Sequence, residues 1–468
     1  MELAKETLVE QPRSTSVKLS VKEKVSYALS DTACNLVFSM ITMYLMYYYT
    51  DVAGLNVAAV GTLLLIARVI DAFDSPIFGI LIDKTNTKWG KSRPWFLWLC
   101  LPFTIMAVLT FSVPDISDTG KLVYAYITYI CLGILYAGIN LPIGSLLPSL
   151  TTDSQERTVA TTFRMIGGQT GSLIVAFLGL TLVGLLGGSN EQLGFTLTMI
   201  IFGVIAVCMF LLAFKNTRER ANVNGGAAVP FNQSIKALLP NKPWWILTVV
   251  MFVTWTVTSA KMANTVYFLK YNIGNEAFVG LVNGLGSIAM IAGLFTVPFL
   301  SKKLSPKMIV CLGCVVGIVG QFVLLASSMT QSITIVIIGT IIGGMGSGLP
   351  AGIMGVMMSD IIDYGEIKFG VRAQGLLSSA IAFGVKFGMG IGAAISSIIL
   401  GAAGYVANQT QTTEVLHAID FNFVIMPIIG FVLMLVCMIF YKLDRERDDI
   451  RRQIEQKRLD EEGGQFES

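Results

Sequence analysis

Charged side chains are scarce in this chain of 468 residues. Asp, Glu, Lys and Arg make up 13% of it and hydrophobic residues 54%, whereas soluble domains have roughly 25% charged residues. Histidine is almost missing, since His417 is the only one in the sequence. A metal site built from histidines and a Ser-His-Asp triad are therefore not expected.

Other features of enzymes are missing as well. The seven cysteines all fall in long apolar stretches, so a disulfide framework on the outer side is not expected. No P-loop motif for binding phosphate occurs, which excludes ATP hydrolysis as the energy source. No nucleophile–base pair or metal cluster is apparent, so the sequence predicts neither an enzyme nor a bound cofactor.

Long apolar stretches are what the chain has instead. Stretches of about twenty residues recur along its length, and each can cross a bilayer as a helix. Hydropathy predicts twelve spans, at 27–50, 57–82, 95–113, 122–148, 159–186, 194–214, 244–271, 278–300, 308–327, 332–359, 376–402 and 420–441. We therefore expect an all-α membrane protein that lies in a lipid bilayer.

A polar connection divides these spans into two groups of six. It covers 215–243, so we expect one six-helix bundle at 24–214 and a second at 244–441. Polar segments at 1–23 and 442–468 flank the bundles. The polar character of the first segment predicts that no signal peptide is cleaved from it.

Lys and Arg residues are distributed unevenly over the connections. With both termini in the cytoplasm, 27 of the 33 lie in cytoplasmic segments, two in outer connections and four within spans. Because basic residues collect on the cytoplasmic side, this asymmetry predicts a plasma-membrane protein with cytoplasmic termini. It also accounts for the net charge of +3, so no nucleic-acid partner is predicted.

Seven ionisable residues nevertheless lie inside the predicted spans. They are Asp31, Arg68, Asp71, Asp74, Arg164, Lys261 and Lys386. A charge at the middle of a bilayer costs about 2.5–3.5 kcal/mol, so these side chains must face one another or an aqueous cavity. Buried ion pairs stabilise proteins weakly, so a role in transport is favoured over a purely structural set of pairs.

Polar residues also recur at helical spacing in the first half. Tyr27, Asp31 and Asn35 are four residues apart, which places them on one face of the first span. Tyr136 and Asn140 repeat the spacing in the fourth span. A polar stripe can be a simple contact between helices, but several stripes together favour a water-accessible cavity.

The segment GILIDKTNTKWGKSRPW, at 79–95, opens with Gly-x-x-x-Asp-Lys and continues with glycine and basic residues. This pattern resembles the loop motif of the major facilitator superfamily. Its longer form resembles the glycoside-pentoside-hexuronide:cation symporters, which include melibiose permease. Further matching stretches lie at 43–55, 139–157 and 360–375, so the resemblance covers nearly the whole chain.

The resemblance implies twelve helices in two bundles around a central site that is reached alternately from each side. It also implies a sugar site, whose positions are Asn35, Tyr136, Asn140, Arg164 and Lys386, with Asp31 and Tyr27 on the same stripe as Asn35. Asn35 and Asn140 stand where melibiose permease has acidic residues. An amide still bonds sugar hydroxyls but brings no charge.

The cation site differs from that of the family. Asp71 aligns with the first of two carboxylates, Ser75 with the second, and Asp74 with the Asn between them. A hard cation prefers several oxygen ligands, preferably two of them anionic, so Ser75 weakens a sodium site. A single desolvated Asp can instead carry a proton. We therefore expect H+ as the coupling ion, carried by Asp71, with Na+ at Asp71 and Asp74 as the alternative.

Three further residues are expected around this carboxylate. Arg68 and Lys261 are predicted to join Asp71 and Asp74 in an internal network, although Lys261 has no counterpart in the family. A second interpretation pairs Asp74 with Arg68 across the helix face. The resemblance assigns Lys386 to the coupling of the sugar and cation sites.

These observations predict a secondary active transporter that moves a sugar and a cation together by alternating access, as a monomer. Gly144 and Ala351 replace two aromatics near the sugar, so a pentose-containing or other small glycoside is favoured over melibiose. A hexuronide stays open because Arg164, Lys261 and Lys386 could receive its carboxylate. A sodium-coupled carrier of the melibiose type and a lysophospholipid:cation symporter are further alternatives.

Overall fold

The computed structural model describes residues 18–151, 153–220, 239–370, 374–447, 449–450 and 452–453. Its α-helices are α1 (Val21–Tyr47), α2 (Val57–Lys84), α3 (Arg93–Thr110), α4 (Asp118–Leu150), α5 (Ser154–Gly187), α6 (Glu191–Asn216), α8 (Lys242–Tyr267), α9 (Val279–Leu300), α10 (Pro306–Thr330), α11 (Ile333–Phe369), α12 (Gln374–Ala402), α13 (Thr413–Asp420) and α14 (Met426–Phe440). Short helical turns are η1 (Tyr48–Val52), η2 (Phe268–Asn272), η3 (Glu276–Phe278), η4 (Phe421–Ile425) and η5 (Leu443–Arg445). The prediction of an all-α protein is confirmed.

Several helices begin where the sequence supplies a capping side chain. Ser20 forms a capping box with Glu23 at the start of α1, in which each side chain accepts the other residue's backbone N–H. The Asn56 side chain accepts two backbone N–H groups at the start of α2, and Asn190 accepts one at the start of α6. Since the first N–H groups of a helix lack partners within it, these residues fix where the helices start.

Eleven helices of the described residues are long and apolar enough to cross a membrane. The exception among the long helices is α2, whose 28 residues include Arg68, Asp71 and Asp74. A multi-pass helical protein is thus confirmed. The predicted count of twelve spans depends on α2, whose ionisable residues need partners inside the protein.

The outer surface is apolar, as a bilayer requires. Leu185 is 76% exposed, Phe299 72% and Ile439 67%, and each lies on a long helix. Exposure of many large apolar side chains to water is unfavourable, whereas their contact with lipid chains is not.

Some helices extend beyond the predicted spans. α11 is 37 residues long and continues ten residues past the predicted span at 332–359. The last span starts seven residues earlier than predicted, because α13, η4 and α14 form one continuous helical segment over Thr413–Phe440. Hydropathy marks only the apolar part of a helix, so it misses polar helix ends.

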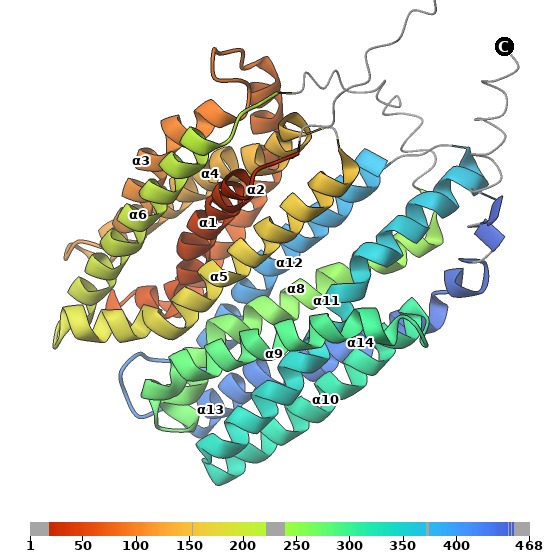
Figure 1. The fold of residues 1–468 in the computed structure, drawn as a ribbon. Helices are drawn as coiled ribbons and strands as arrows, with labels where there is room; N and C mark the ends of the chain where they lie inside the picture. Colours follow the sequence, from red (N-terminus) through yellow and green to blue (C-terminus); the bar gives the residue numbers. More distant parts are fainter. Residues whose placement is uncertain are drawn as a thin grey trace, which may run out of the picture.

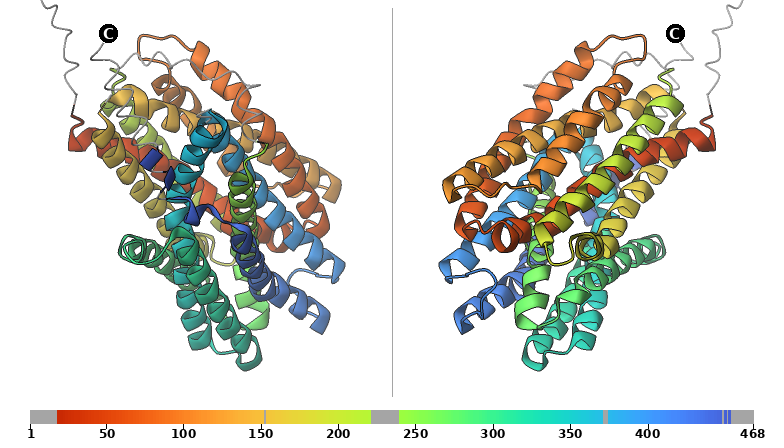
Figure 2. Two further views of the ribbon diagram at one scale, coloured as in Figure 1. Left: turned by 90° about the vertical axis from the view of Figure 1, so that its right-hand side faces the viewer. Right: turned by 90° about the vertical axis from the view of Figure 1, so that its left-hand side faces the viewer.

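The long helices form two groups. Figure 1 shows α1 to α6 together on one side, and α8 to α11 with α14 on the other. In the right-hand view of Figure 2, the red-to-yellow helices of the first group lie above most of the green and teal helices of the second. α12 packs on α8 of its own half and on α2 of the other, while α5 meets α9 and α1 meets α8. These contacts form the boundary between the groups.

Candidate functional site

The polar stripe of α1 packs against glycines of α5. A Cβ atom on Gly168 would lie 2.7 Å from Asp31 Oδ2, and one on Gly171 would lie 3.1 Å from Asn35 Cβ. The glycines therefore let the two helices approach at the level of these side chains. Arg164, one turn before Gly168, lies with its Nε 3.9 Å from Asp31 Oδ2.

Arg164 keeps hydrogen-bonding capacity. Its Nε is buried and has no hydrogen-bond partner in the part of the chain that the structure describes, while its side chain is 34% exposed. Tyr27 lies beside it and donates its hydroxyl to the Ile143 carbonyl of α4, 2.8 Å away. The Asn35 Nδ2 group donates to the Asp31 carbonyl at 2.9 Å, which leaves its second N–H available.

α4 supplies two further predicted sugar-site residues. The Tyr136 ring stacks on Phe38 of α1, with 5.2 Å between ring centres. Asn140 lies one turn further along α4, next to the Cys34 thiol of α1. The structure thus brings the predicted residues of α1, α4 and α5 to one interior face of the first group.

Arg68 and Asp71 of α2 form a close ion pair. The Arg68 guanidinium donates to Asp71 Oδ2 at 2.7 Å and to the Tyr129 hydroxyl of α4 at 2.9 Å. Asp71 also lies against α4, since a Cβ on Gly133 would be 2.8 Å from its Oδ1. The interpretation that pairs Asp74 with Arg68 is wrong, because the guanidinium is turned toward Asp71 and Tyr129 instead.

Asp74 points toward the other group of helices. Its Oδ1 lies 3.9 Å from the Lys386 ammonium of α12. Asp74 is 5% exposed, whereas the Lys386 side chain is 42% exposed. This ion pair therefore joins α2 and α12 across the boundary, in the middle of two apolar helices. The side chain of Ser75 lies outside the described residues.

Lys261 lies elsewhere. It lines a cavity inside the second group, with its ammonium 5.1 Å from the centre of the Phe423 ring. The structure does not bring it together with Arg68 and Asp71. The sequence predicts one network for Arg68 and Lys261 because both are cations within spans. Spacing along the chain does not show how α2 and α8 are placed relative to each other, so it cannot separate the two residues.

An interior carboxylate that sequence reasoning missed lies at the far end of α1. The Asp51 side chain is fully buried. It accepts hydrogen bonds from the Tyr271 hydroxyl at 2.6 Å, the Tyr405 hydroxyl at 2.7 Å and the Lys270 ammonium at 3.3 Å. Asn408 donates to the Asp51 carbonyl at 2.7 Å. We call these five residues the Asp51 cluster.

The Asp51 cluster ties the two groups together. Asp51 comes from the first half of the chain, and the other four residues of the cluster come from the second. Burial raises the pKa of the Tyr405 hydroxyl, so this group stays protonated and donates. Both π-helical turns at the cluster, η1 and η2, continue the first helix of a group. Such turns often occur at functional sites, but no sequence signal distinguishes them from ordinary helix.

The residues 26–445 match the family described as MFS/sugar transport protein. The chain belongs to this family. It is 42% identical to the isoprimeverose transporter of Lactiplantibacillus pentosus over 96% of this chain and 95% of that one. It is 32% identical to a putative glycoside/cation symporter of Escherichia coli over 93% and 95% of the two chains. The predicted resemblance to sugar:cation symporters is thus confirmed, and the protein is a transporter, not an enzyme.

Solved structures show the same fold at low identity. A bacterial homologue of the human lysosomal transporter Spinster superposes with a TM-score of 0.70 at 14% identity, over 92% of this chain and 97% of that one. A D-xylose–proton symporter superposes with a TM-score of 0.64 at 15% identity, over 87% and 96%. These similarities show the transporter fold alone.

Proposed function

We propose that this protein carries a xylose-containing disaccharide into the cell together with a proton. The substrate class is suggested by the relative that transports isoprimeverose, a disaccharide of xylose and glucose, since the two chains are similar over almost their whole length. Relatives named as glycoside/cation symporters support cation coupling. The observation that carries the mechanism is the ion pair of Asp74 and Lys386 across the boundary.

The sugar is bound by the interior face that α1, α4 and α5 form. Arg164 offers an Nε–H that has no hydrogen-bond partner within the described residues, and Asn35 and Asn140 offer amides that pair with hydroxyls. Tyr136 presents a ring to which an apolar face of a sugar can pack. Asp31 and Tyr27 position the Arg164 guanidinium.

The coupling proton is carried by Asp71. Protonation would remove the charge that attracts Arg68, which donates to Asp71 at 2.7 Å. Arg68 also packs closely on Gly390 of α12, and Lys386 lies one turn before Gly390. Protonation of Asp71 therefore alters the position of Arg68 and, through it, the packing of α2 on α12, where Asp74 meets Lys386. In this way proton binding alters how the two groups of helices fit together.

A proton suits this arrangement better than sodium. The two candidate carboxylates already face cations, Asp71 facing Arg68 and Asp74 facing Lys386. A sodium site would need several oxygen atoms that converge without nearby positive charge.

The membrane setting follows from the same proposal. Twelve spans place both termini on one side, and the distribution of Lys and Arg puts that side in the cytoplasm. The Asp51 cluster then closes the outer end of a plasma-membrane protein. Substrate and proton pass through one chain, which acts as a monomer. A proton that moves down a potential of 100 mV supplies about 2.3 kcal/mol, enough for roughly fiftyfold accumulation of a neutral sugar.

A glucuronide is the second candidate substrate. The chain is 33% identical to a glucuronide carrier protein homologue of Escherichia coli over 94% of this chain. Arg164 and Lys386 are 34% and 42% exposed, so both could receive a carboxylate. The lower identity and the two Asn residues at the sugar site favour the neutral disaccharide.

Uptake by the purified protein in liposomes tests this proposal. Labelled isoprimeverose is offered under an inward proton gradient or an inward sodium gradient. We expect the wild type to accumulate the sugar under the proton gradient alone. The Asp71→Asn variant should lose accumulation but keep exchange of internal for external sugar, because exchange needs no net release of the proton.

Asp115→Asn is the matched control. Its side chain is 98% exposed outside the spans, so the same chemical change there should leave accumulation intact. Accumulation driven equally by sodium would refute proton coupling. Accumulation by Asp71→Asn would remove this residue from the mechanism, and transport of glucuronides without isoprimeverose would change the substrate.

A further inference from the structure

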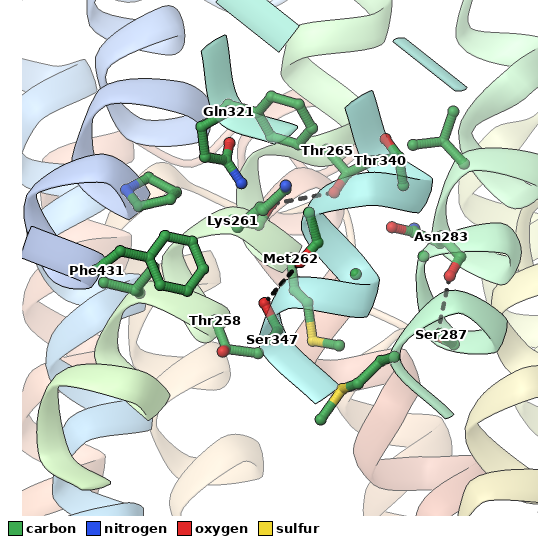
Figure 3. Close-up of a pocket in the computed structure, with 18 residues that line it drawn as sticks. Thr258, Lys261, Met262, Thr265, Asn283, Ser287, Gln321, Thr340, Ser347 and Phe431 are labelled. Carbon is green, nitrogen blue, oxygen red and sulfur yellow. Dashed lines mark hydrogen bonds between the residues drawn. The ribbon is translucent and has the colours of Figure 1, made fainter. Parts of the chain in front are cut away.

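A cavity lies inside the second group of helices, apart from the ion pairs described above. Its volume is about 120 Å³, and α8, α9, α10, α11 and the η4–α14 segment surround it. Figure 3 shows Lys261, Gln321 and Thr340 gathered around this space, with Phe431 at one side. A water molecule needs roughly 10–15 Å³ on this measure, so the cavity can hold a ligand of several heavy atoms.

Three buried polar atoms around the cavity lack a hydrogen-bond partner among the described residues. They are Asn283 Nδ2, Gln321 Oε1 and Thr340 Oγ1, and the Asn283 amide also lies beside the Tyr44 hydroxyl of α1. Gln321 is 2% exposed and Thr340 5%, so bulk water does not reach them. Buried polar groups in proteins are normally paired. A donor, an acceptor and a hydroxyl therefore face one cavity. A ligand that both accepts and donates hydrogen bonds could pair with all three.

Lys261 and two aromatic rings complete the lining. The Lys261 ammonium offers three N–H donors, and it lies over the Phe423 ring, 5.1 Å from the ring centre. Phe423 and Phe431 both line the cavity and present apolar ring surfaces. A lining that combines hydrogen-bonding groups with aromatic rings suits a molecule that is polar at its edge and apolar on its face.

A glycine keeps this space open. A Cβ atom on Gly343 of α11 would lie 3.3 Å from Gln321 Nε2 and 3.9 Å from Lys261 Nζ. Any larger side chain at this position would therefore grow between the two polar residues. Gly343 is one of three lining glycines, the others being Gly286 and Gly344.

The wall of the cavity is also part of the boundary between the two groups. Asn283 lies on α9, where a Cβ on Gly280 would be 3.1 Å from the Ala176 carbonyl of α5. Movement of α9 against α5 during transport would thus change access to the cavity. This location fits a site that is used during transport rather than a permanent structural void.

We propose that this cavity is a sugar subsite in the second group of helices that holds one pyranose ring of the transported glycoside. The inference rests on the proposed function, since it assigns a second ring of the same substrate. Sugar hydroxyls both donate and accept, so they can pair with Gln321 Oε1 and with Asn283 Nδ2 at once. A carboxylate alone would pair with Asn283 and Lys261 but not with Gln321 Oε1.

Binding of isoprimeverose to the purified full-length protein, measured by calorimetry, tests this subsite. Gln321→Leu removes the buried acceptor while keeping a similar volume, so it should weaken binding about tenfold, which corresponds to about 1.4 kcal/mol. Because this variant also removes an unpaired polar atom, its melting temperature should stay the same or rise. Weaker binding in an equally stable protein cannot be explained by misfolding.

A pair of glycine variants provides the size test. Gly343→Val fills the cavity and should weaken binding at least tenfold. Gly355→Val lies on the same helix, where an added Cβ meets nothing within 4 Å, so it should bind like the wild type. Normal isoprimeverose binding by both Gln321→Leu and Gly343→Val would overturn the subsite.

A charged probe separates sugar from anion recognition. Methyl glucuronide is titrated into the wild type and into Lys261→Gln, which keeps an N–H donor but loses the charge. We expect the variant to lose glucuronide affinity by a larger factor than isoprimeverose affinity, because the amide still donates to a sugar hydroxyl but no longer attracts a carboxylate. If it loses only glucuronide binding, and Gln321→Leu leaves isoprimeverose binding unchanged, the cavity is an anion site and the inference is wrong. A wild type that binds no glycoside at all would instead refute the proposed function.

Discussion

Arg68 shows how a charge can be accommodated within an apolar helix. Its guanidinium donates to Asp71 at 2.7 Å and to Tyr129 at 2.9 Å, while the stem of the side chain packs on Gly390 of α12. The side chains of Arg68 and Asp71 are 16% and 15% exposed. Each charge therefore depends on the other, and the cost of removing one should exceed the cost of removing both.

Stability measurements on single and double variants test this dependence. Asp71→Asn leaves Arg68 without its carboxylate and should destabilise the protein by about 3 kcal/mol. Arg68→Met keeps the stem but leaves Asp71 uncompensated, with a similar expected loss. The double variant removes both charges and should recover most of the stability, as judged by thermal unfolding in detergent. Losses that simply add in the double variant would show that the two residues do not stabilise each other.

α5 illustrates how an element positions the site. Its glycines at 167, 168 and 171 face α1, and a Cβ on Gly167 would lie 2.5 Å from the Ala28 carbonyl. Because a backbone carbonyl cannot turn aside as a side chain can, α1 would have to move. The closeness of Asp31 to Arg164 therefore depends on residues that carry no functional group at all.

Alanine substitutions along α5 should separate this role from helix propensity. Gly167→Ala should lower stability by about 1–3 kcal/mol through overpacking, and it should weaken sugar binding because Asp31 moves away from Arg164. Gly184→Ala is on the exposed face of the same helix, with nothing within 4 Å of the added Cβ. It should be neutral or stabilise by up to about 1 kcal/mol. Equal melting temperatures for the two variants would argue against close packing of α1 on α5.

The sequence predicted the helical elements well because apolar length is a local property. It also predicted that Asp31, Asn35 and Arg164 share an interior face, since the spacing within each helix and the family resemblance agree. The partners across helices were harder to predict. One interpretation of the sequence pairs Asp74 with Arg68, six residues away on the same helix, whereas its partner Lys386 comes from α12 on the other side of the boundary.

At the scale of the whole molecule, the Asp51 cluster lies where the two groups of helices are held together. Asp51 and Lys270 are separated by 219 residues in the chain, so no local pattern predicts their contact. At the opposite end, the ion pairs of Lys24 with Glu156 and of Arg447 with Asp360 each stay within one half of the chain. The bonds across the boundary thus favour a state closed at the Asp51 end.

This asymmetry predicts that Asp51→Asn shifts the protein toward opening at that end. In the wild type, Tyr271, Tyr405 and Lys270 share the two oxygens of the Asp51 carboxylate. The amide of the variant has only one acceptor oxygen for these three donors. The loss of a charge-assisted bond to a buried group costs about 1.5–3 kcal/mol, which corresponds to a population change of more than tenfold.

Spin labels on both sides of the boundary measure this shift. The labels are placed at Ser189 and Asn275, which are exposed and follow α5 and η2 respectively, in a variant whose native cysteines are replaced by alanine. Asp51→Asn should add a longer component to the distribution of distances between the labels. Asp115→Asn makes the same chemical change on an exposed side chain, so it should leave the distribution unaltered. An unchanged distribution in Asp51→Asn would mean that apolar packing of α2 on α12 and of α5 on α9 keeps this end closed without the cluster.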